Sequence, residues 1–423
     1  MTTPSSAWKP LLTGDLAAQV SQTVEEIAQA LDDFPADTLG QRHASLAGGV
    51  AGEALLHAYL FLHNGDEQRA ERAAALLETA VEALASTVML PGLYSGFAGI
   101  AWAVEHLQSR LFEADPESDP EEGDTNHEID EALLSFLTAP KENEEYDLIS
   151  GLTGLGVYGR ERLARPSGAA VLESVVDRLA AQAESGPAGM TWFTTPERLP
   201  EWQREVHPKG LYNLGAAHGM PAVIALLAVA CAAGVAAERA RPLLDGAVRW
   251  LLSNRRPPGS GSCFSSFAGE DAPPSRLAWC YGDPGVAATL LVAARAVGEP
   301  AWEEEALAIA RAAAARPTED AGVRDPGICH GAAGLAHLLN RFWQASGEEV
   351  FAAAARFWIG RTLELRVPGE GVAGFRAWHA QRSTQGEWLS EPGFLEGAAG
   401  VGLVLLAAVS TVEPEWDRIL LVS

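Results

Sequence analysis

Two cysteines and a histidine occupy matching places in the sequence. Cys329 and His330 are neighbours in "DPGICHGAAGLAHLLNRF" (residues 325–342), and Cys280 lies upstream in "WCYGDPG". Each cysteine stands two residues before a glycine, and His330 stands one residue before a glycine. Two thiolates and one imidazole can bind zinc and leave its fourth position open, as catalytic zinc requires. A cysteine at a helix start is ordinarily a small packed hydrophobe, so the matching offsets are what favour a metal site.

Other side chains that could do chemistry stand at similar places. His218 precedes a glycine by one residue and could pass a proton, or could merely cap its helix. Asp147, four residues before a glycine, could orient such a donor or serve only as an N-cap. Arg276, four residues before Cys280, is by default a solvated loop charge, but beside a metal it could stabilise an oxyanion. Glu396, one residue before a glycine, is a weaker candidate.

The elements that carry these residues repeat along the chain. Each copy is Gly-x-x-Gly followed by a strongly apolar helix, and in one copy Ala222 replaces the second glycine. The copies recur every 47 to 68 residues, which indicates a repeat fold. A structural role in close backbone packing is the default for these glycines. The first glycines of the seven copies are Gly49, Gly96, Gly151, Gly219, Gly282, Gly331 and Gly397.

A more amphipathic helix precedes each apolar one, as in "AWEEEALAIARAAAA" (residues 301–315). Polar faces on one set of helices, and their near absence on the other, predict an outer and an inner ring. Because no polar capping repeat stands at either end, we expect an α/α toroid of seven helical hairpins, with residues 1–423 as one domain. Repeats five and six are then neighbours, so Cys280, Cys329 and His330 can converge on one zinc ion.

Long connections mark one end of this toroid. Three segments that lead into glycine-led helices are long, namely residues 186–217, 256–281 and 366–396. In repeat folds insertions gather on the binding face, so the glycine end should hold the site. Residues 186–211, rich in Trp, Thr and Pro, are expected to form a small strand-bearing excursion at the rim.

Composition narrows the function. The 56 acidic and 30 basic residues give a net charge of -26, which argues against nucleic-acid binding and is otherwise explained by solubility. No apolar run is long enough to span a membrane without glycine or charge, and the N-terminus lacks signal-peptide features, so we expect a cytoplasmic protein. The four cysteines are too few for a disulfide framework; Cys231, in an apolar helix, and Cys263, in a Gly/Ser loop, are expected to be bystanders.

The motifs resemble those of the lanthionine synthetase C-like family, the lanthipeptide cyclases. The resemblance lies in "YDLISGLTG", "NLGAAHG", "RLAWCYGDPG", "DPGICHGAAG" and "GFLEGAAGVG", and the repeats that carry it cover essentially the whole chain. The fourth copy departs slightly, with Pro221 and Ala222, but proline suits a first helical turn. The resemblance implies an α/α toroid with zinc held by Cys280, Cys329 and His330, and further functional residues at Asp147, His218, Arg276 and Tyr281.

The resemblance also implies a reaction. Peptide cysteine thiols would add to dehydroalanine or dehydrobutyrine in the same peptide and form lanthionine or methyllanthionine rings. Zinc would deprotonate the thiol, and sulfur-rich ligation would keep the attacking sulfur nucleophilic. Attack at the β-carbon creates an enolate, which needs stabilisation and then a proton at the α-carbon. We expect His218 to supply or relay that proton, Asp147 to orient a neighbouring donor, and Arg276 to stabilise charge.

Partners follow from the same resemblance. Because the repeats fill the chain, a stand-alone cyclase is expected to receive a leader-bearing precursor peptide from a separate dehydratase, with a membrane synthetase or exporter complex as a candidate docking partner. Two alternatives stay open: a zinc thiol-binding or glutathione-binding relative, and a zinc prenyltransferase-like enzyme, which usually needs a basic diphosphate pocket. Glycosidases with paired carboxylates share the fold, but sulfur and imidazole stand at the aligned positions here.

Overall fold

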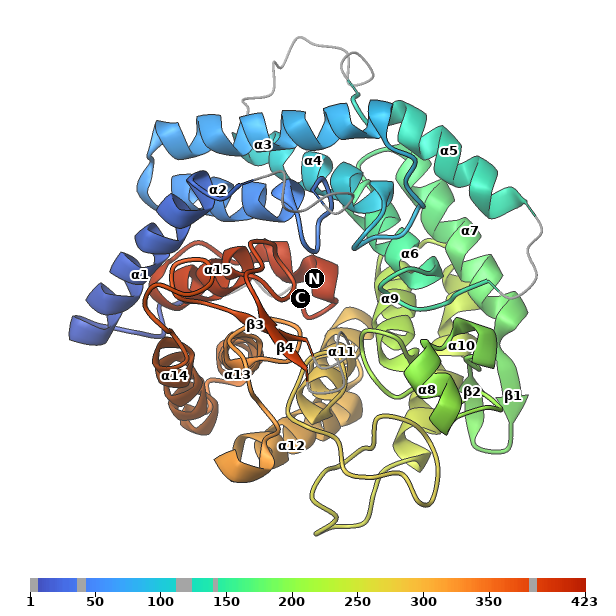
Figure 1. Ribbon diagram of the computed structural model, residues 1–423. Coiled ribbons are helices and arrows are strands. Elements are labelled where there is room, and N and C mark those ends of the chain that lie inside the picture. The colour runs from blue at the N-terminus through green and yellow to red at the C-terminus, as the bar shows by residue number, and fades with distance from the viewer. Residues whose placement is uncertain (1–6, 36–42, 112–123, 140–143, 380–385) are drawn as a thin grey trace. The chain divides into compact units, whose positions relative to one another are not determined.

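The structure is a computed structural model that describes residues 7–35, 43–111, 124–139, 144–379 and 386–423. It is mostly helical, with two short strand pairs (Figure 1). The chain divides into two compact units. Unit 1 comprises Met1–Thr87, His106–Glu113 and Val323–Trp416, and unit 2 comprises Val88–Glu105, Ala114–Gly322 and Asp417–Ser423.

Unit 1 pairs each glycine-led helix with an amphipathic one. Within it, α2 packs against α3, and α13 packs against α14. The last helix, α15, packs against α1 from the other end of the chain. The glycine-led helix at the C-terminal end is thus covered by the amphipathic helix at the N-terminal end. The helices are α1 (Gly14–Asp32), α2 (Val50–Asn64), α3 (Glu67–Ser86), α13 (Ala332–Ser346), α14 (Glu349–Glu364) and α15 (Ala398–Val409); the antiparallel strands are β3 (Ala377–His379) and β4 (Glu387–Leu389).

Unit 2 follows the same rule. Here α6 packs against α7, α9 against α10, and α11 against α12. Helix α4 (Phe97–Leu111) has residues in both units. The other helices are α5 (His127–Thr138), α6 (Leu152–Glu161), α7 (Pro166–Gln182), α8 (Glu201–Val206), α9 (Met220–Ala232), α10 (Ala237–Ser253), α11 (Asp283–Val297) and α12 (Pro300–Ala314), with 3₁₀ turns at Pro196–Arg198 (η2) and Thr318–Asp320 (η3). The 3₁₀ turn at Glu415–Leu420 (η4), like α4, has residues in both units.

Burial separates the two sets of helices as their sequences predict. All but a few residues of α9 and α15 are buried, whereas α3 and α12 bury only one stripe each. An apolar sequence without a polar face is stable only where it is surrounded by protein, whereas an amphipathic helix covers it and meets water. The seven glycine-led and seven amphipathic helices that the repeats predict are all present, and the short helix α8 is an addition. Six glycine-led helices pack mainly against the amphipathic helix that follows them, with α1 following α15, and not against the one that precedes them.

The glycine pairs let each glycine-led helix fold back onto the loop before it. Ala332, which follows the first glycine of repeat six, donates its N–H to the carbonyl of Asp325 at 2.8 Å. A Cβ on Gly331 would lie 2.5 Å from that carbonyl oxygen, and a Cβ on Gly334 would lie 1.8 Å from the carbonyl oxygen of Ile328. The backbone of Gly331 is extended, a conformation that any residue can adopt. Glycine is therefore needed here because it has no Cβ. Equivalent hydrogen bonds of 2.8–3.2 Å close the loops before α2, α4, α6, α9 and α15.

The long segments carry the strands. Strands β1 (Glu184–Gly186) and β2 (Gly189–Thr191) form an antiparallel pair at the start of the predicted excursion, which confirms a small strand-bearing element there. Strands β3 and β4 form a second antiparallel pair inside residues 366–396, for which no strand is predicted. Segments 186–217 and 256–281 are joined by hydrogen bonds from Leu214 to Ser266 and from Ala268 to Tyr212, both 2.9 Å.

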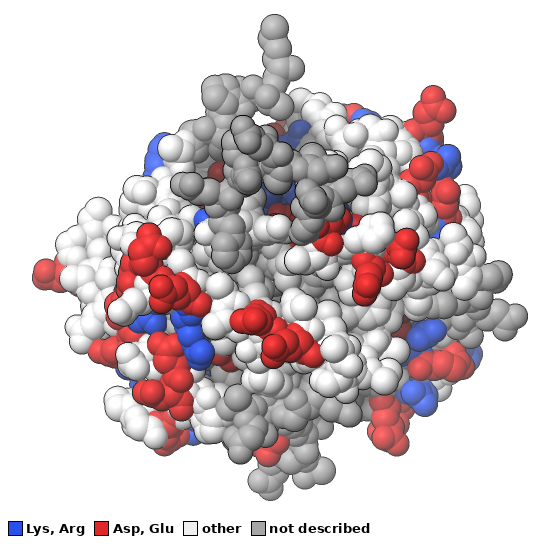
Figure 2. Space-filling view, turned by 90° about the horizontal axis from the view of Figure 1, so that it is seen from above, with Lys and Arg blue, Asp and Glu red and all other residues white. Residues whose placement is uncertain are grey.

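The surface agrees with the acidic composition. Figure 2 shows one face, on which groups of acidic side chains lie among fewer basic ones. None of the helices in the described ranges combines the length and the apolar character that crossing a membrane requires.

Replacing Gly334 by alanine should destabilise the protein by at least ~2 kcal/mol, because the new Cβ must displace the carbonyl of Ile328. The matched control is Gly360→Ala in the middle of α14, where a Cβ meets no atom within 4 Å. That change should add about 0.5–1 kcal/mol, because alanine is the better helix former. Urea unfolding of the two variants measures both effects; equal stabilities would contradict this role of the glycine pair.

Candidate functional site

Main-chain hydrogen bonds tie the loops before the glycine-led helices side to side. In unit 2, the N–H of Ala217 donates to the carbonyl of Cys280 at 3.3 Å. In unit 1, the N–H of Cys329 donates to Leu395, and that of Leu395 to Ala47, both at 2.9 Å. All five residues lie two positions before the first glycine of a repeat. Within each unit, this lateral bonding brings residues at equal offsets to neighbouring places, as the repeats predict.

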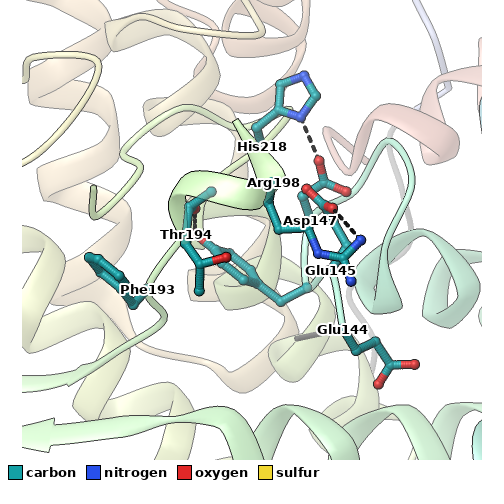
Figure 3. Close-up of a pocket in the computed structure, with 9 residues that line it drawn as sticks. Glu144, Glu145, Asp147, Phe193, Thr194, Arg198 and His218 are labelled. Carbon is teal, nitrogen blue, oxygen red and sulfur yellow. Dashed lines mark hydrogen bonds and ion pairs between the residues drawn. The ribbon is translucent and has the colours of Figure 1, made fainter. Parts of the chain in front are cut away.

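Asp147 and His218 come from different repeats and form a hydrogen-bonded pair (Figure 3). The Oδ1 atom of Asp147 accepts the N–H of Ser150 at 2.9 Å, and its Oδ2 atom lies 2.5 Å from Nδ1 of His218. The N-caps of α6 and α9 are Gly151 and Gly219, so neither Asp147 nor His218 is a helix N-cap. Because the Asp147 side chain is 4% exposed and that of His218 is 43% exposed, a buried carboxylate orients an accessible imidazole.

The surroundings of this pair favour a protonated imidazole. Burial opposes charge on His218, but the hydrogen bond and charge of Asp147, with negative charge at Cys280 and Glu145, raise the pKa of His218 above its ordinary value. Burial, followed by the charge of Asp147, raises the pKa of Glu145 to about 7, although Arg198 lies 3.5 Å from that carboxylate. The hydrogen bond and the charge of Asp147 therefore stabilise a proton on His218 relative to an isolated imidazole.

A small pocket, with a cavity volume of about 30 Å³, adjoins the pair within unit 2 (Figure 3). Residues 144–147 supply part of its wall, and residues 193–195, which follow β2, supply another part. The pocket combines carboxylates, a guanidinium group, hydroxyls and an aromatic ring, so it suits a polar chain with apolar side groups. Among its lining residues are Glu144, Glu145, Phe193, Thr194, Arg198 and His218.

Tyr281 lies beside His218 and is held on two sides. Its ring centroid is 6.0 Å from that of His218, with 23° between the planes. Gly215 leaves room for the ring, since a Cβ there would lie 2.5 Å from Cδ1 of Tyr281. Nδ2 of Asn213 donates to the Tyr281 hydroxyl at 3.2 Å. Burial raises the pKa of Tyr281 to about 12, so the phenol stays neutral and can donate a hydrogen bond.

Arg276 lies against Cys280 and is not a solvated loop charge. Its Nη2 atom is 3.6 Å from Sγ of Cys280, and its side chain is partly buried. The next residue, Leu277, donates its N–H to the carbonyl of Ala321 at 2.8 Å. Gly322 leaves room for Arg276, because a Cβ there would lie 2.8 Å from Cβ of the arginine. The local backbone thus fixes a permanent positive charge beside a buried thiol.

Cys329 and His330 end the loop before α13. Cys329 is buried, and the side chain of His330 is 14% exposed. Nε2 of His330 lies 3.1 Å from Oδ2 of Asp325, and Nδ1 lies 3.9 Å from Oε1 of Glu396. Glu396 also lies 3.3 Å from Nε2 of His379 in β3. The imidazole is therefore placed between two carboxylates of its own unit.

The other two cysteines lie apart from these groups. Cys231 is half-buried near the end of α9, and Cys263 is half-buried in the segment before α11, where its N–H donates to Asp283 at 2.9 Å. None of the four cysteines forms a disulfide, and burial raises the pKa of both Cys231 and Cys263. That Cys231 and Cys263 are bystanders stays a prediction of the sequence.

Comparison with known proteins identifies the family. Residues 40–421 match the family model described as "Lanthionine synthetase C-like protein". The chain belongs to this family. The assignment confirms the resemblance that the glycine, cysteine and histidine motifs indicate.

One sequence comparison and one structure comparison show how far this chain resembles known proteins. "Nisin biosynthesis protein NisC" of Lactococcus lactis subsp. lactis is 24% identical over 374 residues, which cover 85% of this chain and 84% of that protein. A solved structure named "Nisin cyclase" matches with a TM-score of 0.74 and 21% identity, over 96% of this chain and 98% of that chain. The structural likeness confirms the α/α toroid predicted from the seven repeats.

Three residues that hold the site together escape the sequence analysis. Glu145, Asn213 and Asp325 contact Arg198, Tyr281 and His330 respectively. Each lies six positions before the first glycine of its repeat, where its carbonyl accepts the closing hydrogen bond of the loop. The residue types differ between copies, so the signal is a polar residue at a fixed offset and not a motif.

Replacing Asp147 by asparagine should lower the pKa of His218, because the imidazolium loses the charge and the hydrogen bond that stabilise it. The His218 ring signals in an NMR titration should then shift at lower pH than in the wild type. Glu145→Gln is the matched comparison and should move the titration in the same direction by less, because its charge contributes less. An unchanged titration in Asp147→Asn would contradict the pairing.

Proposed function

We propose that the chain is a zinc-dependent lanthipeptide cyclase that adds peptide cysteine thiols to dehydroalanine or dehydrobutyrine within one precursor peptide. The products are lanthionine and methyllanthionine rings. The observation that carries the proposal is the Asp147–His218 pair, a proton-holding imidazole beside a small pocket, in a chain of the lanthionine synthetase C-like family. The names of the nisin proteins support the same substrate class.

The proposed zinc ligands are Cys280, Cys329 and His330. Two thiols and an imidazole suit zinc and disfavour hard cations such as magnesium or calcium. Both thiols are buried, and the imidazole is oriented by Asp325, as expected for ligands that must not move. Three protein ligands would leave one position for substrate, and bound zinc would supply the Lewis acidity that lowers the pKa of an incoming thiol.

The remaining chemistry falls to side chains of this protein. The sulfur bonds to the β-carbon, the π electrons move toward the carbonyl oxygen, and a proton must reach the α-carbon. Since Asp147 engages Nδ1 of His218, Nε2 is the nitrogen that can deliver this proton. Arg276 and the neutral hydroxyl of Tyr281 are the nearby donors for negative charge on oxygen. The proton released by the substrate thiol replaces the proton that His218 delivers to the α-carbon, so the reaction needs no further reactant.

We propose that the pocket beside His218 binds the part of the peptide that adjoins the reacting residue. Its walls are partly polar and partly aromatic, so they suit a peptide backbone with varied side chains. A precursor that forms several rings would place a different segment there for each ring. The separate dehydratase, the leader-bearing precursor, the cytoplasmic setting and the peripheral association with a synthetase or exporter complex stay predictions of the sequence.

His218→Asn should slow ring closure by about 10²–10⁴-fold while the zinc content stays unchanged, because the variant removes a proton donor and no proposed ligand. The assay incubates protein with dehydrated precursor and counts free thiols by alkylation and mass spectrometry. Loss of thiols without a change in mass indicates cyclisation, whereas prenyl transfer adds mass and simple thiol binding consumes none. His127→Asn, at an exposed site on α5, is the control. Unaltered kinetics and products in His218→Asn would remove it from the mechanism.

Removal of zinc should abolish cyclisation, and added zinc should restore it. Cys280→Ala and Cys329→Ala should each lower bound zinc well below about one ion per chain, since two protein ligands rarely retain it. Cys231→Ala and Cys263→Ala serve as controls, and elemental analysis should find zinc retained in both. Full zinc content in Cys280→Ala or Cys329→Ala would contradict the proposed ligand set.

A further inference from the structure

The residue six positions before the first glycine has a second role in repeats four and six. In repeat six, Oδ1 of Asp325 accepts the N–H of Gly327 at 3.0 Å. In repeat four, Oδ1 of Asn213 accepts the N–H of Gly215 at 2.9 Å. Both side chains are buried, so each folds back over its own loop and stabilises the same turn. The two positions are structurally equivalent, although their residue types differ.

In repeat six the loop contact leaves one carboxylate oxygen for another partner. Oδ2 of Asp325 lies 3.1 Å from Nε2 of His330. The Asp325 residue is only 2% exposed, and Gly331 makes room for it, because a Cβ there would lie 2.4 Å from Oδ1. Backbone and glycine together fix the carboxylate, so its direction toward the imidazole is built into the fold.

We propose that Asp325 is a positioning residue that selects the ring nitrogen with which His330 binds metal. Oδ2 of Asp325 faces Nε2 at 3.1 Å, and a carboxylate can only accept hydrogen bonds, so the neutral imidazole with its hydrogen on Nε2 is favoured. The lone pair then resides on Nδ1, which becomes the ligand atom. Nδ1 lies 3.9 Å from Oε1 of Glu396, which is beyond hydrogen-bond length, so Asp325 is the nearer of the two carboxylates. The inference rests on the proposed zinc site.

The substitution Asp325→Asn tests this assignment with little change in shape. The amide oxygen can still accept from Gly327, but the group facing Nε2 becomes an N–H donor, which favours the tautomer with hydrogen on Nδ1. Removal of such an outer partner typically weakens metal binding by about 10–100-fold. We therefore expect the dissociation constant for zinc alone, measured by competition with a chelator, to rise by about that factor in Asp325→Asn.

Asn213→Ala is the matched control for the loop. It removes the equivalent turn contact with Gly215 in repeat four and leaves Asp325 and its contact with His330 unchanged. It should retain the zinc affinity of the wild type, whatever happens to its thermal stability. Zinc affinity in Asp325→Asn within threefold of wild type, at equal folding, would overturn the proposal.

If Asp325→Asn fails to fold, a second measurement tests which ring nitrogen of His330 carries the hydrogen. In metal-free wild-type protein, ¹⁵N NMR of the histidine rings should show His330 as the tautomer with hydrogen on Nε2. Hydrogen on Nδ1 would overturn the proposal directly. If the wild type shows the expected tautomer but binds no zinc, the proposed zinc function fails and the orienting contact stands, so the two failures are distinguishable.

Discussion

The close approach of each glycine-led helix to the loop before it is the constraint on which the rest of the structure depends. A carbonyl six residues upstream accepts the first N–H of the helix, at a distance that tolerates no Cβ on the intervening glycines. Once this loop is closed, the residues one, two, four and six positions before the glycine have fixed places. The repeats then vary those residues without changing the frame, which is how one structural unit supplies thiols, imidazoles and carboxylates.

Two histidines at the same position in their repeats face their carboxylates through different ring nitrogens. His218 and His330 both stand immediately before a first glycine, and each meets a buried carboxylate. Asp147 reaches His218 from another repeat and engages Nδ1, whereas Asp325 belongs to the loop of His330 and engages Nε2. The ring nitrogen that faces the carboxylate therefore differs, Nδ1 in His218 and Nε2 in His330. Opposite orientations of the same residue type suit opposite roles, proton delivery in one case and metal ligation in the other.

Much of this could be predicted because the repeat is visible in the sequence. Glycine spacing and helix polarity predict seven helix pairs, and offsets from the glycines single out Cys280, Cys329, His330, His218 and Asp147. Glu145, Asn213 and Asp325 could not be found in this way, because their residue types differ between copies and their side-chain partners are set by tertiary geometry. Nor does the sequence say which nitrogen of His218 or His330 is engaged, since that depends on tertiary geometry. The second strand pair, β3 and β4, lacks the alternating pattern of a half-buried strand.

The most direct test of the central claim is X-ray absorption at the zinc edge, on the purified protein before and after addition of dehydrated precursor peptide. The account predicts a zinc shell with two sulfur neighbours at ~2.3 Å and nitrogen at ~2.0 Å. A third sulfur should join the shell when the peptide is present. A shell of nitrogen and oxygen alone, or one that is unchanged by peptide under turnover conditions, would contradict the claim.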